Sequence, residues 1–62
     1  MHTLKDLRTK ANISQVELAE KIGVTQSAVA MWETGEAMPR ADKLPVLAEI
    51  LGCSISDLFK EG

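Results

Sequence analysis

The chain has 62 residues, a net charge of −2 and 45% apolar residues, a composition that excludes a disordered chain and favours one small packed domain over residues 1–62. No apolar run approaches the roughly 18 residues of a membrane span and no signal peptide begins the chain, so we expect a cytoplasmic protein without a membrane partner. One cysteine, Cys53, cannot form an internal disulfide, and no residue pattern indicates a metal site, a cofactor or a catalytic nucleophile with its base. We therefore expect that the protein is not an enzyme.

The first predicted helix covers residues 3–10. Thr3 and Asp6 match the spacing of a capping box, in which a hydroxyl and a later carboxylate bind free backbone N–H groups at the start of a helix. The apolar face of this helix consists of Leu4, Leu7 and Ala11. Arg8 flanks that face, so we expect its guanidinium to be partly buried and to bind an acidic side chain; the alternative is that it reaches a phosphate.

Two short helices follow, predicted over residues 15–22 and 26–33. Ser14 and Glu17 match a second capping box, and Thr25 can cap the next helix. Gly23 and Gly35 mark the ends of these helices, since glycine readily adopts the positive φ angle found after a helix. The inward faces consist of Leu18, Ala19 and Ile22 on one helix and Ala28, Val29 and Trp32 on the other.

The last two helices are predicted over residues 43–51 and 55–60. Asp42 can cap the first of them, which places Pro45 in the first turn, where its missing N–H does no harm, and Gly52 ends it. Ser54 and Asp57 match a third capping box. The core-facing residues are Leu44, Leu47, Ala48, Leu51, Leu58 and Phe59. Short connections and poor strand signals predict a compact all-α domain of five helices.

Residues 14–34 meet the requirements of a helix-turn-helix unit. The tight turn Gly23-Val24-Thr25 joins two short helices, and Ala19 is small where the two would cross. Their shared core is supplied by Leu18, Ile22, Val24, Val29 and Trp32. The pattern therefore predicts two helices that meet at a steep angle and are locked by the turn between them.

The outward side of the helix over residues 26–33 indicates a contact surface. This side contains none of the Glu and Lys residues that usually cover a helix surface. It consists of Gln26, Ser27, Ala30 and Met31. A glutamine can form two hydrogen bonds with adenine in the major groove, and alanine or methionine can contact a thymine methyl group. We expect these four residues to contact DNA bases. The alternative is a helix whose small residues pack without any ligand.

The segment SQVELAEKIGVTQSAVAMWETG resembles the helix-turn-helix of the Cro/C1-type (XRE, lambda-repressor-like) family of DNA-binding domains. The residues that carry the resemblance are Gln15, Ala19, Gly23, Val29, Trp32, Glu33 and Gly35. The segment PRADKLPVLAEILGCSISDLF is similar to the fourth and fifth helices of the same family. The resemblance implies the five-helix lambda-repressor-like fold, with the helix-turn-helix formed by helices 2 and 3, and double-stranded DNA as the partner.

The resemblance also implies contacts with the DNA backbone. It places Gln15 against a phosphate, where the start of the helix adds free N–H groups and a partial positive charge. Thr25, Arg40 and Lys43 are further candidates for phosphate contacts, and the alternative for Arg40 and Lys43 is that both are solvated charges. Glu36 departs from the family pattern, which often has lysine there, and a carboxylate near DNA predicts modest, salt-sensitive affinity.

For Arg8 the resemblance implies a specific partner. In the family the matching residues form a salt bridge that ties the first helix to the end of the recognition helix. Carried over to this chain, the pair is Arg8 with Glu33. Removing one member of such a pair strands the other charge, so the pair is expected to be structural.

Val46 and Ile50 predict a dimer. They lie four residues apart on the fourth helix, away from its core face, and they add apolar surface to a small domain. A two-fold homodimer through the fourth and fifth helices would place two recognition helices about 34 Å apart on a near-palindromic operator. The alternative is that the fifth helix covers both residues.

Together these features predict a sequence-specific, nucleoid-associated transcriptional regulator, a repressor of phage or bacterial type. Because the chain ends at Gly62 without a sensor domain, we expect a stand-alone Cro-like protein unless the chain is a fragment of a longer repressor. The acidic balance and Glu36 support one alternative, a protein-interaction module of antitoxin or scaffold type on the same fold.

Overall fold

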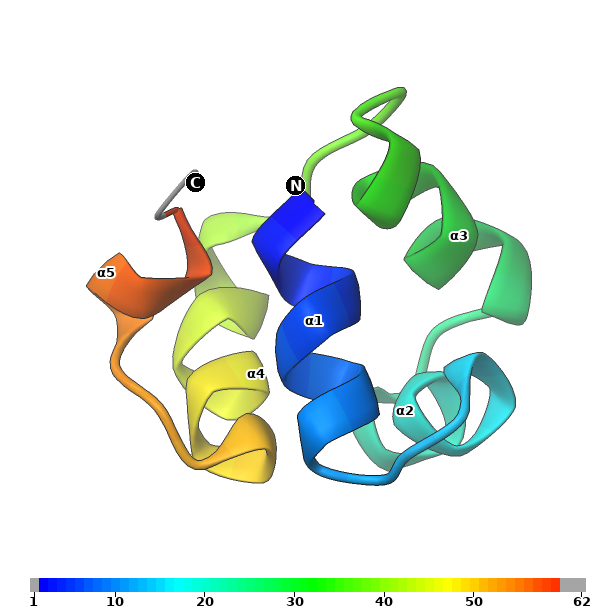
Figure 1. Cartoon of the computed structure of the whole chain (residues 1–62). Coiled ribbons are helices and arrows are strands. Elements are labelled where there is room, and N and C mark those ends of the chain that lie inside the picture. The colour runs from blue at the N-terminus through cyan, green and yellow to red at the C-terminus, as the bar shows by residue number, and fades with distance from the viewer. Residues whose placement is uncertain (1, 60–62) are drawn as a thin grey trace.

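All regular structure in the described residues is helical. The structure is a computed structural model that describes the backbone of residues 2–59 and the side chains of residues 3–59. In this range the elements are α1 (His2–Lys10), α2 (Gln15–Ile22), α3 (Gln26–Thr34), the 3-10 turn η1 (Ala41–Lys43), α4 (Leu44–Leu51) and α5 (Ile55–Leu58). The predicted all-α fold of five α-helices is confirmed (Figure 1).

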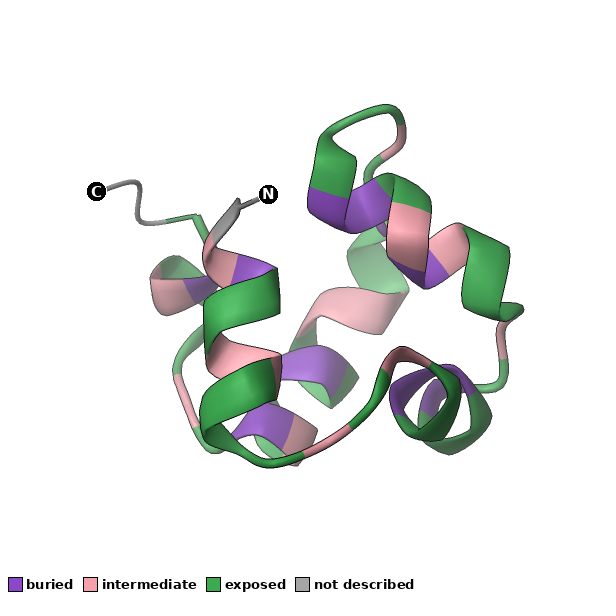
Figure 2. Cartoon of the chain, turned by 45° about the vertical axis from the view of Figure 1, so that its right-hand side comes forward, coloured by how far each residue is buried: buried purple, intermediate pink, exposed green. Residues whose placement is uncertain are grey.

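One apolar core joins all five helices. Each helix contributes one completely buried side chain to it, and these are Leu4, Leu18, Val29, Leu47 and Leu58. α1 contacts α3 and α5, α2 packs mainly against α3, and α4 packs against α5. Figure 2 shows the buried segments facing inward from each helix. Because each helix supplies a fully buried residue, removal of any one helix would expose the core to water.

The predicted caps of α2, α3 and α5 are confirmed. The Ser14 hydroxyl accepts a hydrogen bond from the Glu17 N–H at 3.1 Å, and the Glu17 carboxylate accepts one from the Ser14 N–H at 3.3 Å. The same reciprocal pair links Ser54 and Asp57. Thr25 caps α3 by accepting from the Ala28 N–H. These short-range bonds define where three of the helices begin.

Two predicted caps are wrong. Helix α1 begins at His2, so Thr3 has a helical backbone and cannot act as the N-cap, which requires an extended one. Asp42 does not cap α4, because it lies inside η1 and Lys43 precedes the helix without any side-chain cap. The 3-10 turn leads directly into α4, so the Ala41 carbonyl of the turn accepts from the Leu44 N–H at the start of the helix.

Two residues predicted in the core are exposed. Ala11 lies in the turn after α1, because that helix ends at Lys10 and the chain reverses at Asn12, whose φ is +61°. Phe59 follows the four-residue helix α5 and is 45% exposed, because Leu58 already occupies the core position at that end. Both residues directly follow the last residue of a helix, where helical spacing no longer predicts which side chains face the core.

The turn between α2 and α3 has the geometry of a helix-turn-helix. Gly23 adopts φ +85°, and the N–H groups of Gly23 and Val24 both donate to the carbonyl of Ala19, at 2.8 and 3.0 Å. A Cβ atom at Gly23 would meet no other atom within 4 Å. The glycine is therefore required by backbone conformation and not by lack of space.

Substitutions at Gly23 test this distinction. Gly23→Ala should lower the free energy of unfolding by about 1 kcal/mol, because alanine resists the left-handed conformation. Gly23→Asn should cost clearly less, because asparagine tolerates this conformation. Urea titration followed by circular dichroism measures both variants, and equal losses would contradict the backbone explanation.

Candidate nucleic-acid interface

The first turn of α3 is exposed and carries no charge. Gln26 and Ser27 are exposed there, Met31 is 39% exposed one turn later, and Ala30 is half-buried between them. On the opposite side of the helix Val29 is completely buried, as is most of Trp32. The structure thus places the four predicted base-contacting residues on the outward side of α3 and uses the other side to hold the helix.

A chain of polar side chains links this surface to the interior. Gln26 Nε2 donates to Gln15 Oε1 at 3.4 Å, and Gln15 Nε2 donates to Glu33 Oε1 at 2.9 Å. Glu33 Oε2 accepts from Arg8 Nε at 2.6 Å, and Oε1 also lies 3.4 Å from Arg8 Nη2. Two residues predicted to contact DNA therefore connect to the pair predicted to be structural.

The Arg8 side chain is mostly buried and binds groups inside the protein. Its side chain is 13% exposed, two of its nitrogens face Glu33, and Nη1 donates to the carbonyl of Ile13 at 2.8 Å. This arrangement leaves little of the guanidinium for a phosphate, so the structure favours the acidic partner over the alternative. Because Glu33 is only 8% exposed, its carboxylate needs the donors that surround it.

The other candidates for phosphate contacts differ in their surroundings. The Thr25 hydroxyl accepts from the Ala28 N–H as the cap of α3. Arg40 is exposed and lies 3.9 Å from the Asp42 carboxylate, whereas Lys43 is half-buried in η1. Glu36 is exposed in the loop after α3. The structure brings Gln15 and Gln26 together, and it leaves the cations Arg40 and Lys43 on the segment that precedes α4.

The residues predicted to form a dimer surface also differ from each other. Val46 is 39% exposed, but Ile50 is half-buried and packs against the core. Two further apolar side chains near the end of the chain are exposed: Ile55 of α5 at 41%, and Phe59, which follows that helix, at 45%. The expectation that Ile50 stands clear of the core is therefore wrong, because the core extends to it.

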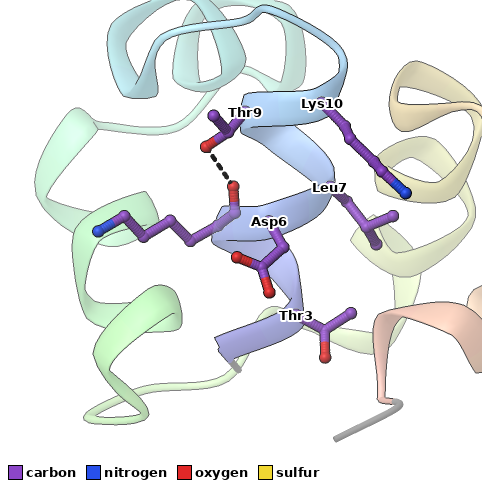
Figure 3. Close-up of a pocket in the computed structure, with 6 residues that line it drawn as sticks. Thr3, Asp6, Leu7, Thr9 and Lys10 are labelled. Atoms are coloured by element: carbon purple, nitrogen blue, oxygen red, sulfur yellow. Dashed lines mark hydrogen bonds between the residues drawn. The ribbon is translucent and has the colours of Figure 1, made fainter. Parts of the chain in front are cut away.

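Other parts of the described chain offer no comparable site. A hollow of about 710 Å³ lies on α1 (Figure 3), but all of its lining residues, from Thr3 to Lys10, belong to that one helix. No cluster of potential metal ligands and no helix that could cross a membrane occurs among the described residues. Burial raises the pKa of the Cys53 thiol, and the nearby Asp57 carboxylate adds to the effect. A raised pKa leaves less of the reactive thiolate at neutral pH.

Comparison with known proteins agrees with this geometry. The helix-turn-helix family matches residues 4–58. The chain belongs to this family. The chain is 33% identical to the HTH-type transcriptional activator BcrR of Enterococcus faecalis over 90% of its own length, and 41% identical to the 26 kDa repressor protein of Escherichia phage HK022 over 71%. It spans only 28% and 19% of those two relatives.

A third relative is similar in length to this chain. An uncharacterized HTH-type transcriptional regulator of Archaeoglobus fulgidus is 30% identical over 90% of the chain, which spans 79% of that protein. No solved structure matches the chain significantly. The resemblance to Cro/C1-type domains is confirmed by the family match, which covers all five helices apart from the first residues of α1.

Because the ion pair is buried, removing one of its charges should destabilise the protein more than removing both. Arg8→Met should lower the free energy of unfolding by about 3 kcal/mol or more, because it leaves the Glu33 carboxylate buried without its cation. The double variant Arg8→Met, Glu33→Leu should recover most of that loss, since neither charge remains. Urea titration of both variants checks the prediction, and a double variant less stable than Arg8→Met would contradict it.

Proposed function

We propose that this family member is a sequence-specific DNA-binding transcriptional regulator, a repressor of phage or bacterial type, and that it acts by binding and not by catalysis. The observation that carries the proposal is the uncharged outward side of α3, whose first residue, Gln26, bonds to Gln15 at the start of α2. Two helix starts then face the same region, which suits a major groove flanked by phosphates. The names of the relatives support a role in transcription.

In the proposed complex the residues divide into two groups. Gln26, Ser27, Ala30 and Met31 contact base edges and thymine methyl groups in the major groove. Gln15, Thr25, Arg40 and Lys43 contact phosphates, which orient the protein without reading sequence. Arg40 must exchange Asp42 for a phosphate, and Glu36 opposes binding, so we expect modest affinity.

Selection of sites from random duplex DNA tests the proposal. We expect a cytoplasmic regulator, and we expect the selection to enrich one near-palindromic site. On that site Gln26→Ala should lower the preference for one base by about 1–3 kcal/mol. Arg40→Ala should weaken binding to all sequences alike and should reduce the slope of log affinity against log salt by about 1.

Lys10→Ala is the matched control for Arg40→Ala. It removes one positive charge from an exposed residue of α1 that points away from α3 (Figure 3). Its effect on DNA affinity should be small, because charges outside the interface are largely screened. Failure to enrich any site would reject the proposal and would favour a protein-interaction module on the same fold.

We further propose that the chain binds its operator as a homodimer through α4 and α5. Val46 of α4, Ile55 of α5 and Phe59, which follows α5, are exposed, and a small domain gains stability by covering such residues. A two-fold axis at this surface would present two α3 helices to two half-sites about 34 Å apart. The near-palindromic operator follows from that symmetry.

Val46→Asp tests the dimer. The charge should shift the protein towards monomer in sedimentation at high micromolar concentration, because a dimer would bury an unpaired carboxylate. Val16→Asp is the matched control, since Val16 is similarly exposed, at 46%, but lies on α2. Wild-type protein that stays monomeric with and without operator DNA would reject the homodimer.

A further inference from the structure

The polar chain from Glu33 to Gln26 has a direction that chemistry dictates. A carboxylate can only accept hydrogen bonds, whereas a glutamine amide has a donor end and an acceptor end. Glu33 accepts from Gln15, so Gln15 must present its NH2 group inward. The Oε1 atom of Gln15 then faces outward and accepts from Gln26. The orientation of both amides follows from the acceptor at the inner end of the chain.

The carboxylate that begins this chain is held firmly. Glu33 is the one buried charged residue among the described side chains, and Arg8 Nε binds its Oε2 at 2.6 Å. No buried polar side-chain atom in the described region lacks a hydrogen-bond partner. A rotation of the Gln15 amide would place its oxygen against the Glu33 carboxylate, and two acceptors would then face each other in a buried place.

The orientation of Gln26 determines what it offers to a base. One of its two N–H bonds is used by Gln15, which leaves Oε1 and the second N–H free on an exposed side chain. An acceptor beside a donor complements adenine, which presents the N6 amino group and the N7 acceptor. With the opposite orientation, Gln26 would accept from Gln15 and offer two N–H donors, which complement the O6 and N7 acceptors of guanine.

We infer that Glu33 is a positioning residue for base readout: through Gln15 it orients the Gln26 amide so that this side chain selects adenine over guanine. The part of the inference that concerns DNA rests on the proposed function. The orientation of the Gln26 amide is a property of the protein without DNA. Glu33 does not touch the DNA in this scheme. Its effect on base preference passes through Gln15 alone.

The free protein provides the first test, by nuclear magnetic resonance of the glutamine side-chain amides. Glu33→Gln should shift the Gln26 amide signals although the two residues do not contact each other, because glutamine at position 33 can donate as well as accept and lets Gln15 rotate. In a Gln15→Met background the same substitution should leave Gln26 unshifted. Equal shifts in both backgrounds would overturn the inference, since a general structural change would not depend on Gln15.

The second test measures base preference at the position in the selected site that Gln26→Ala identifies. Wild-type protein should prefer adenine over guanine there, and Glu33→Gln and Gln15→Met should each lower that preference about fivefold or more. Arg8→Lys is the control, because it weakens the ion pair but retains the Glu33 carboxylate, and it should leave the preference unchanged. Circular dichroism at the assay temperature confirms that each variant is folded.

Gln15→Met leaves the ion pair intact, so it tests the step from Gln15 to Gln26 even where Glu33→Gln does not fold. A preference for guanine in the wild type, or an adenine preference that survives both Glu33→Gln and Gln15→Met, would overturn the inference. If random DNA yields no site, the proposed function fails, and the amide signals still decide whether Glu33 orients Gln26.

Discussion

The buried carboxylate of Glu33 links the stability of this protein to its candidate interface. Transfer of a carboxylate out of water is unfavourable unless strong donors replace the lost water. Here Arg8 of α1 and Gln15 of α2 provide those donors. Since Glu33 belongs to the last turn of α3, the contact fixes one end of that helix against both neighbours. The apolar core alone is less specific, because hydrophobic contact has no direction.

The same contact explains how a small acidic domain can present an ordered polar surface. Gln15 lies between the interior and the solvent, so its hydrogen bond to Glu33 also restricts Gln26. Restriction before binding reduces the entropy that a complex would lose. Order of this kind matters more where charge contributes little, and here Asp42 lies beside Arg40 and Glu36 follows α3.

With two of the three named relatives the chain shares one domain and not the whole protein. The relatives include one protein named as an activator and one named as a repressor, and the chain spans under a third of each. A shared domain in proteins of opposite effect is what we expect if this unit supplies DNA recognition alone. The direction of regulation then depends on where the bound site lies relative to a promoter, or on other parts of each protein.

Sequence patterns alone located the five helices, because the signals that start and end a helix act within three or four residues. The Ser14 and Ser54 boxes and the left-handed glycines are such local signals, and the spacing of apolar residues placed the outward side of α3. The salt bridge between Arg8 and Glu33 was predicted only from the family resemblance. Three features became visible only in the folded chain: Phe59 is exposed, Ile50 packs on the core, and Gln15 joins Glu33 to Gln26. The two glutamine contacts span 11 or more residues, and the exposure of Phe59 depends on where a helix ends; local patterns contain no information about either.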